Sequence, residues 1–172
     1  MSYVPLRQLY LQAVIAGITE EIVADGCKLL HERKRTFTHG AAKTPSDDPL
    51  LLRTIGELKA TAFTLKTLIL EAAKSIDNAL SHKNNKELYH QYQHEAALQA
   101  AHVKIIGEKL ALQAATNLFD IGGASATRKD LQLDRHWRNI RTIASHNPSS
   151  YKEKDIGNYL VNDKPLPLNG YY

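Results

Sequence analysis

The sequence predicts an all-α protein, an antiparallel up-and-down helical bundle of three long helices and a shorter fourth. Three stretches of roughly 30 residues each repeat apolar side chains at intervals of three and four, the period of one helix face. The 172 residues include only 9 glycines and 6 prolines, which leaves room for long uninterrupted helices. Helices of similar length that are joined by short or moderate loops pack as antiparallel neighbours.

The first long helix is expected from about Pro5 to about Lys34. Proline suits a first helical position, and basic residues at the far end interact well with the helix dipole. The segment from Thr36 to Asp47 contains glycine, proline and serine and is expected to be a loop. The apolar stripe of this helix comprises Leu6, Leu9, Tyr10, Ala13, Val14, Gly17, Ile18, Ile22, Leu29 and Leu30.

The second long helix has the clearest start. The Asp48 side chain can accept hydrogen bonds from free backbone N–H groups, and Pro49 follows at the first helical position. Residues 82–86 form a polar turn. The stripe of the second helix comprises Leu52, Ile55, Leu58, Ala62, Leu65, Ile69, Ala72, Ile76 and Leu80.

The third long helix is expected from about Lys86 to about Phe119, and two glycines at 122–123 are the expected stop. A shorter helix is expected over residues 133–144, until Pro148 breaks it. The remaining tail is expected to hold at most one short helical turn before an extended Lys164–Pro167 segment. These boundaries predict a bundle domain over residues 1–148 and a C-terminal tail over residues 149–172 that packs on the bundle or on a neighbouring subunit.

Several classes of protein are disfavoured by composition. The single cysteine, Cys27, cannot form an internal disulfide or a cysteine-based zinc site. The N-terminus has no leader pattern, and no apolar run approaches the roughly 18 residues that a membrane span needs. We therefore expect a cytoplasmic protein without a membrane or nucleic-acid partner. Neither a phosphate loop, nor a dinucleotide fingerprint, nor a nucleophile elbow is present in the sequence.

Histidines on the third helix raise the question of a metal site. His90, His94 and His102 are spaced by four and eight, and Glu87 precedes His90 in an E-x-x-H arrangement. A carboxylate-bridged di-iron bundle needs a second such motif, and the sequence has none. We therefore expect no metal site and interpret these residues as surface or interface histidines.

The most informative stretch follows the third helix. Gly122 and Gly123 would let a ligand approach the backbone, and Ser125 adds a hydroxyl. The segment from Arg128 to Arg141 then carries five basic and two acidic residues, a local net charge of +3. These features fit either a site for a small anionic group such as a phosphate, or a capped helix followed by a turn and a solvated basic helix.

The same stretch resembles a known family. It contains the block Asp134-Arg135-His136-Trp137-Arg138-Asn139-Ile140-Arg141-Thr142, followed by His146-Asn147-Pro148, and the chain opens on Pro5-Leu6-Arg7-Gln8-Leu9-Tyr10-Leu11. These motifs are similar to the C-terminal domain of the acyl-CoA dehydrogenase superfamily, and closest to its flavin-dependent monooxygenases of the dibenzothiophene monooxygenase and sulfur-compound branch. The resemblance covers essentially the whole chain.

Members of that family are longer than this chain. Their N-terminal helical domain and central β-domain, which hold most of the flavin and substrate site, are both absent from these 172 residues. The chain is therefore expected to be a part of such an enzyme or a truncated homologue, and inactive alone.

The resemblance also implies a cofactor, partners and site residues. The cofactor is FMN, with FAD as the alternative, and contacts to the flavin of a neighbouring subunit are expected at Phe119, Gly122, Gly123 and Ser125. The partners are further copies of the chain, in a dimer or tetramer, and a separate flavin reductase.

His146 is the expected catalytic residue. Many dehydrogenases of the superfamily carry a glutamate base just after the short helix, whereas residues 145–148 here contain no carboxylate. The resemblance implies that His146 lies beside the flavin ring and helps to stabilise the oxygenated flavin. The other interpretation is that it only caps the helix C-terminus.

The sequence is consistent with three functions. The first is the C-terminal oligomerisation and flavin-completing domain of a two-component FMN-dependent monooxygenase acting on a small sulfur-containing or aromatic compound. The second is a fragment of an acyl-CoA dehydrogenase-like FAD oxidoreductase. The third is a non-enzymatic helical interaction module.

Overall fold

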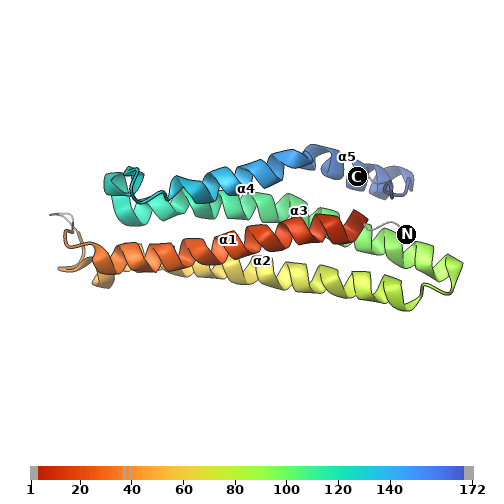
Figure 1. Ribbon diagram of the computed structural model, residues 1–172, viewed down its shortest axis with the longest axis horizontal. Helices are drawn as coiled ribbons and strands as arrows, with labels where there is room; N and C mark the ends of the chain where they lie inside the picture. The colour runs from red at the N-terminus through yellow and green to blue at the C-terminus, as the bar shows by residue number, and fades with distance from the viewer. Residues whose placement is uncertain (1–3, 37, 39, 169–172) are drawn as a thin grey trace.

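The computed structural model describes residues 4–36, 38 and 40–168, and within these ranges it is helical without any strand (Figure 1). The all-α bundle expected from the sequence is confirmed. Short 3-10 turns, η1 and η2, lie at Pro45–Asp47 and Gly123–Thr127. The helices are α1 (Val4–Glu32), α2 (Pro49–Ser81), α3 (Lys86–Gly122), α4 (Asp134–His146) and α5 (Ser149–Asn162).

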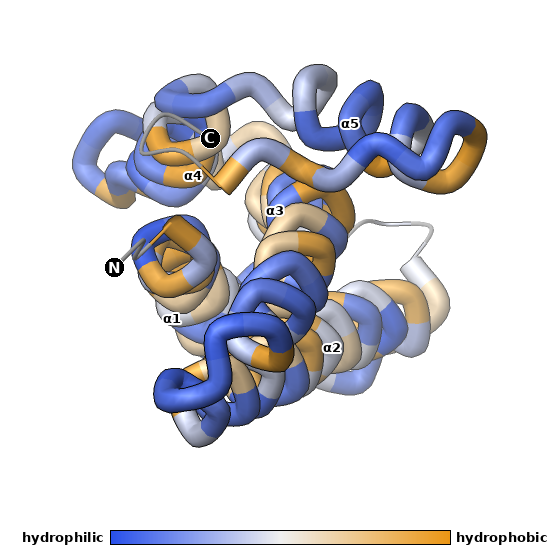
Figure 2. Tube along the Cα trace, turned by 90° about the vertical axis from the view of Figure 1, so that its right-hand side faces the viewer, coloured by the Kyte–Doolittle hydropathy of each residue, from blue (hydrophilic) through white to orange (hydrophobic). Residues whose placement is uncertain are grey.

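The longest helix, α3, is the centre of the fold. It contacts α1, α2, α4 and α5, so that two layers meet along it: α1 and α2 on one side, and α4 and α5 on the other (Figures 1 and 2). Its buried face includes seven alanines, which keep the side chains between helices short. Larger apolar residues from the neighbours, among them Ile15, Leu58 and Ile140, fill the core around it.

The predicted start of α2 is confirmed in detail. The Asp48 carboxylate accepts hydrogen bonds from the backbone N–H groups of Leu50 at 2.9 Å and Leu51 at 3.4 Å, and Pro49 occupies the first turn. Asn85 caps α3 in the same way, by accepting from the Leu88 N–H at 3.2 Å. The sequence capping rule therefore located the start of α2, and α3 begins at the expected Lys86, with a cap that the sequence had not singled out.

The apolar stripe expected on the first helix is partly wrong. Leu6, Tyr10 and Val14 are exposed, while the polar side chains of Gln8 and Gln12 are buried. The apolar residues of this part of α1 lie on more than one face of the helix. Periodicity alone therefore could not tell which face packs against α3. The exposed apolar side is consequently available to further protein.

The C-terminal tail departs most from expectation. Instead of one short turn, residues 149–162 form α5, a helix of 14 residues. It has no continuous apolar stripe, since Leu160 and Val161 are 74% and 79% exposed. The residue of α5 that is fully buried is a lysine, Lys152, at 1% exposure. A hydrophobic pattern cannot reveal a helix that docks through polar groups.

Polar contacts attach α5 and the segment after it to α3. Ser149 donates a hydrogen bond to Glu108. Farther along, the Leu166 N–H donates to His94 Nε2 at 3.0 Å, and the Tyr159 ring meets the His94 ring at 4.6 Å between centroids. His94, interpreted from the sequence as a surface or interface histidine, is thus half-buried under the C-terminal segment. Whether residues 149–172 also touch a neighbouring subunit stays a prediction.

Lys152 reaches between α3 and the start of α1, where it lines a small hollow with Val4 and Ala97. The pKa of Lys152 is lowered from 10.5 to about 8, first by burial and second by the nearby charge of Lys104, while the Asp155 carboxylate opposes both effects. No described helix is long and apolar enough to cross a membrane.

We predict that the free energy of unfolding rises between about pH 8 and about pH 10.5, because in this window the unfolded chain binds the Lys152 proton while the folded chain does not. Denaturant titrations across this range should show the rise in the wild type and its loss in Lys152→Met, which keeps the apolar stem without the amine. Lys66→Met, at an exposed position on α2, is the control and should behave like the wild type. Identical pH profiles for wild type and Lys152→Met would contradict the prediction.

Candidate functional site

The end of α1 and the turn after α3 lie at the same end of the bundle (Figure 1). Between them is a surface hollow of about 620 Å³, lined by η2 and by the residues that follow α1. Positive charge is supplied by Arg33, Lys34, Arg35 and Arg128, against one carboxylate, that of Glu32. The volume lies within the roughly 300–1,000 Å³ that small-molecule sites occupy.

The glycines at this turn meet two different requirements. A Cβ at Gly122 would lie 2.7 Å from the Ala126 Cβ, so the turn cannot close on a larger residue. Gly123 has φ +58°, a left-handed conformation that side chains disfavour. The Gly123 N–H donates to the Phe119 carbonyl and ends α3, so α3 runs three residues beyond the predicted Phe119. The hollow therefore has a wall of bare backbone.

Arg33 joins the two chain segments that form the hollow. Its Nη1 donates to the Ile121 carbonyl at 2.7 Å, in the last turn of α3, and its Nε donates to the Arg35 carbonyl at 2.9 Å. From the sequence, the basic residues at the end of the first helix were expected only to interact with its helix dipole. The contact of Arg33 with Ile121 joins residues 88 positions apart, so no local sequence pattern could show it.

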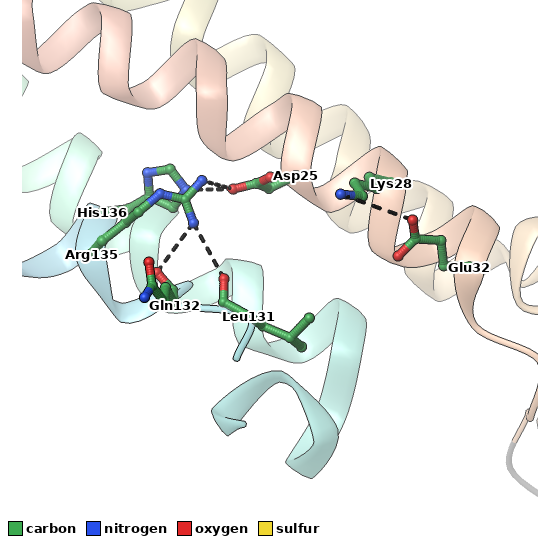
Figure 3. A network of polar contacts seen from close by, with 7 residues as sticks. All are labelled: Asp25, Lys28, Glu32, Leu131, Gln132, Arg135 and His136. Carbon is green, nitrogen blue, oxygen red and sulfur yellow. Dashed lines mark hydrogen bonds and ion pairs between the residues drawn. The ribbon is translucent and has the colours of Figure 1, made fainter. Parts of the chain in front are cut away.

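A polar cluster fixes the segment after η2 against α1 (Figure 3). The Asp25 carboxylate accepts from Arg135 Nη2 at 2.6 Å and from His136 Nε2 at 2.7 Å. Arg135 also donates to the Leu131 and Gln132 carbonyls at 3.4 and 3.2 Å. Because Leu131 lines the hollow, Asp25 holds one of its walls in place.

The predicted site residues separate into two groups. Gly122, Gly123 and Ser125 line the hollow. The Phe119 side chain is half-buried and packs against the hydrophobic core instead. His146 is exposed at the far end of α4, and the 13 residues of that helix put about 20 Å between it and the turn. One chain thus does not bring His146 and the glycine turn together.

A second hollow, of about 370 Å³, lies close to His146. It is bounded by α3 and by the junction of α4 with α5, and its lining includes Arg141, Ser145, Pro148 and Ser149. His146 itself does not line it and is exposed. The junction is short, since only Asn147 and Pro148 separate the two helices.

The basic segment from 128 to 141 is less positive than its composition implies. Three of its five basic residues form ion pairs with aspartates: Arg128 with Asp130, Arg135 with Asp25, and Arg138 with Asp134. Most of the positive charge of this segment is therefore neutralised by aspartates of the same chain. No group of three potential metal ligands occurs among the residues that the structure describes.

The hollow fits the phosphate end of a flavin better than the ring. Cationic side chains and bare backbone suit a phosphate, whereas an isoalloxazine ring suits a slot lined by hydrophobic and aromatic side chains. The lining of the hollow therefore matches only one end of a flavin.

Comparison with known proteins identifies the family. The family model of the acyl-CoA dehydrogenase C-terminal domain matches residues 9–151, and the chain belongs to this family.

The relatives that it matches are named as monooxygenases. The chain is 30% identical over 163 residues to a probable FMNH2-dependent monooxygenase, SfnC, from Pseudomonas putida, covering 94% of this chain and 41% of that protein. It is also 30% identical over 164 residues to a dibenzothiophene monooxygenase from Mycolicibacterium goodii, covering 95% and 39%. The solved methanesulfinate monooxygenase MsuC from Pseudomonas fluorescens superimposes with a TM-score of 0.87 at 27% identity, covering 98% of this chain and 43% of that one. The chain thus spans about two fifths of the length of these relatives.

We predict that Gly122→Ala displaces η2 and lowers the free energy of unfolding by about 1–3 kcal/mol, the usual cost of overpacking. The cause is the 2.7 Å approach of the new Cβ to Ala126. Gly56→Ala is the matched control, because a Cβ there, on an exposed part of α2, meets nothing within 4 Å and should stabilise the helix. Urea titrations give the free energy of unfolding of both variants. If Gly122→Ala is as stable as Gly56→Ala, η2 does not pack as tightly against Gly122 as described.

Proposed function

We propose that residues 1–172 form the C-terminal oligomerisation and flavin-completing domain of a two-component FMN-dependent monooxygenase that oxidises a small sulfur-containing or aromatic compound. The observation that carries this proposal is the cationic hollow at the Gly122-Gly123 turn, in a chain whose relatives are named as FMNH2-dependent and dibenzothiophene monooxygenases. When bound, the reduced flavin would supply the electrons that activate molecular oxygen.

The turn would hold the phosphate end of FMN. Gly123 lets the anion approach the backbone, and Ser125 provides a hydroxyl donor. Arg35 is exposed at the hollow and would contribute charge, whereas Arg128 would do so only by exchanging its ion pair with Asp130 for the phosphate. Phe119, which packs into the core here, would act by supporting the last turn of α3. FMN is favoured over FAD by the name of the Pseudomonas putida relative.

His146 is proposed to act at the reacting centre. An imidazole can donate a hydrogen bond to a reacting oxygen atom and can carry a proton near neutral pH. Because about 20 Å of helix separates His146 from the glycine turn, we infer that the two serve different flavins. The turn would complete the site of a neighbouring subunit, while His146 faces the flavin of its own subunit. This arrangement requires a dimer or tetramer.

Exposed apolar side chains support such an assembly. Leu6, Tyr10 and Val14 follow one another along the outer side of α1, and Leu160 and Val161 are exposed on α5. Contiguous exposed apolar surface marks an interface with further protein. A separate reductase would supply reduced FMN, and the cytoplasm is the proposed location.

An acyl-CoA dehydrogenase activity is less well supported, even though the family takes its name from those enzymes. Proton abstraction from an acyl thioester needs a base, and residues 145–148 contain no carboxylate.

The proposal is tested in a chimera in which residues 1–172 replace the matching C-terminal part of the Mycolicibacterium goodii dibenzothiophene monooxygenase. With reduced FMN supplied, the chimera should oxidise dibenzothiophene. A folded, flavin-bound chimera without activity would count against the monooxygenase function and leave a non-enzymatic interaction module.

In that chimera, His146→Ala should reduce the product formed per reduced FMN consumed by about a hundredfold or more, the lower end of the range for loss of an acid–base group. The unused electrons should appear as hydrogen peroxide. His102→Ala, at an exposed position on α3, is the control and should keep normal product yield. If His146→Ala lowers only the melting temperature and keeps the yield, the residue is merely a helix cap.

A further inference from the structure

Three ionisable side chains are buried where α3 meets α5. Lys104, Lys152 and Glu108 are 1%, 1% and 6% exposed. Lys104 Nζ donates a hydrogen bond to Glu108 Oε1, and the Ser149 hydroxyl donates to Glu108 Oε2 at 2.5 Å. The Glu108 carboxylate therefore bridges a lysine of its own helix and the first residue of α5.

Stability alone is a poor reason for this arrangement. Burying a carboxylate and an ammonium group costs desolvation energy that their attraction barely repays, and well-packed apolar residues often serve as well. Elsewhere on its buried face, α3 uses mainly alanines. Glu108 is distinguished by its second carboxylate oxygen, Oε2, which accepts the hydrogen bond from Ser149 at the start of α5.

Ser149 lies at one end of the junction that carries His146. Asn147 and Pro148 are all that separate α4 from α5, and the proline ring limits the backbone between them. On the other side, Ala144 and Ile140 are buried and fix the end of α4 on α3. Glu108 fixes the start of α5 on the same helix. The backbone at His146 is thus anchored on both sides to α3.

The outer face of the same interface offers a contrast. Lys109, next to Glu108, pairs with Glu153 of α5 at 2.8 Å, and these side chains are 65% and 44% exposed. Such an exposed pair contributes little to the position of a helix. The Glu108–Ser149 contact is directional and its carboxylate is buried, although it borders the second hollow, and it holds the junction.

We propose that Glu108, itself held by Lys104, is a positioning residue that fixes the backbone of His146 through its hydrogen bond with Ser149. The importance of this for catalysis rests on the proposed function, in which His146 acts at the flavin. The positioning itself is a property of the 172-residue chain.

Relaxation measurements on the 172-residue chain, labelled with ¹⁵N, test the proposal. Backbone order parameters at His146, Asn147 and Ser149 should be near 0.85 in the wild type, the value of rigid backbone, and should fall below about 0.6 in Ser149→Ala. Ser149→Thr keeps the hydroxyl and should restore the wild-type values. Glu153→Gln, which breaks the exposed pair, should leave them unchanged.

Two results would overturn the proposal. One is rigid backbone at residues 146–149 in Ser149→Ala. The other is an equal loss of order in Glu153→Gln, which would mean that any contact between α3 and α5 has the same effect. Glu108→Gln is a second variant: it keeps the shape and the acceptor oxygen but not the charge, and it should loosen the junction less than Ser149→Ala.

The chimera separates this proposal from the proposed function. If Ser149→Ala loosens the junction and lowers product yield, and Ser149→Thr restores both, positioning acts through His146. If the junction loosens while product yield stays normal, the positioning stands but does not serve catalysis, and His146→Ala then decides whether His146 is catalytic at all. If His146→Ala abolishes the yield while Ser149→Ala changes neither property, the positioning alone is wrong.

Discussion

Four helices pack against α3, and they can do so because much of its buried face is built of alanine. Short side chains let α1, α2 and α4 approach closely, so that leucines and isoleucines from those helices fill the core between them. The positions of the other four helices are therefore set by their packing against α3. Its C-terminal end carries the Gly122-Gly123 turn, and its middle carries Glu108, which holds the start of α5.

This central helix sets the distance between the two regions of chemical interest. α4 runs back along α3, so the glycine turn and His146 lie at opposite ends of a 13-residue helix. At one end the cations after α1 meet bare backbone, and at the other an exposed histidine follows a tightly held junction. A domain of this shape would supply parts of sites that further protein completes, as the proposed function requires.

Much of the architecture was predictable because it depends on local rules. The Asp48 cap, the stripe around Leu58 and Leu65, and the glycine stop all follow from residues within one or two helical turns. What the sequence did not reveal depends on contacts between distant segments. α5 docks through Lys152 and Ser149 rather than an apolar stripe, and Arg33 reaches the end of α3 from the end of α1. The inward side of α1 was misjudged because its apolar residues lie on more than one side.

Titration of the ¹⁵N-labelled chain with FMN tests the proposal that this domain binds the phosphate end of a flavin at the glycine turn. We expect weak, saturable shifts of the amides of Gly122, Gly123 and Ser125, with a Kd of about 1 mM or higher, since a few hydrogen bonds barely offset the cost of association. Riboflavin, which lacks the phosphate, should leave these amides unchanged, and His146 should not respond to either ligand. Shifts that centre on His146, or equal responses to FMN and riboflavin, would contradict it.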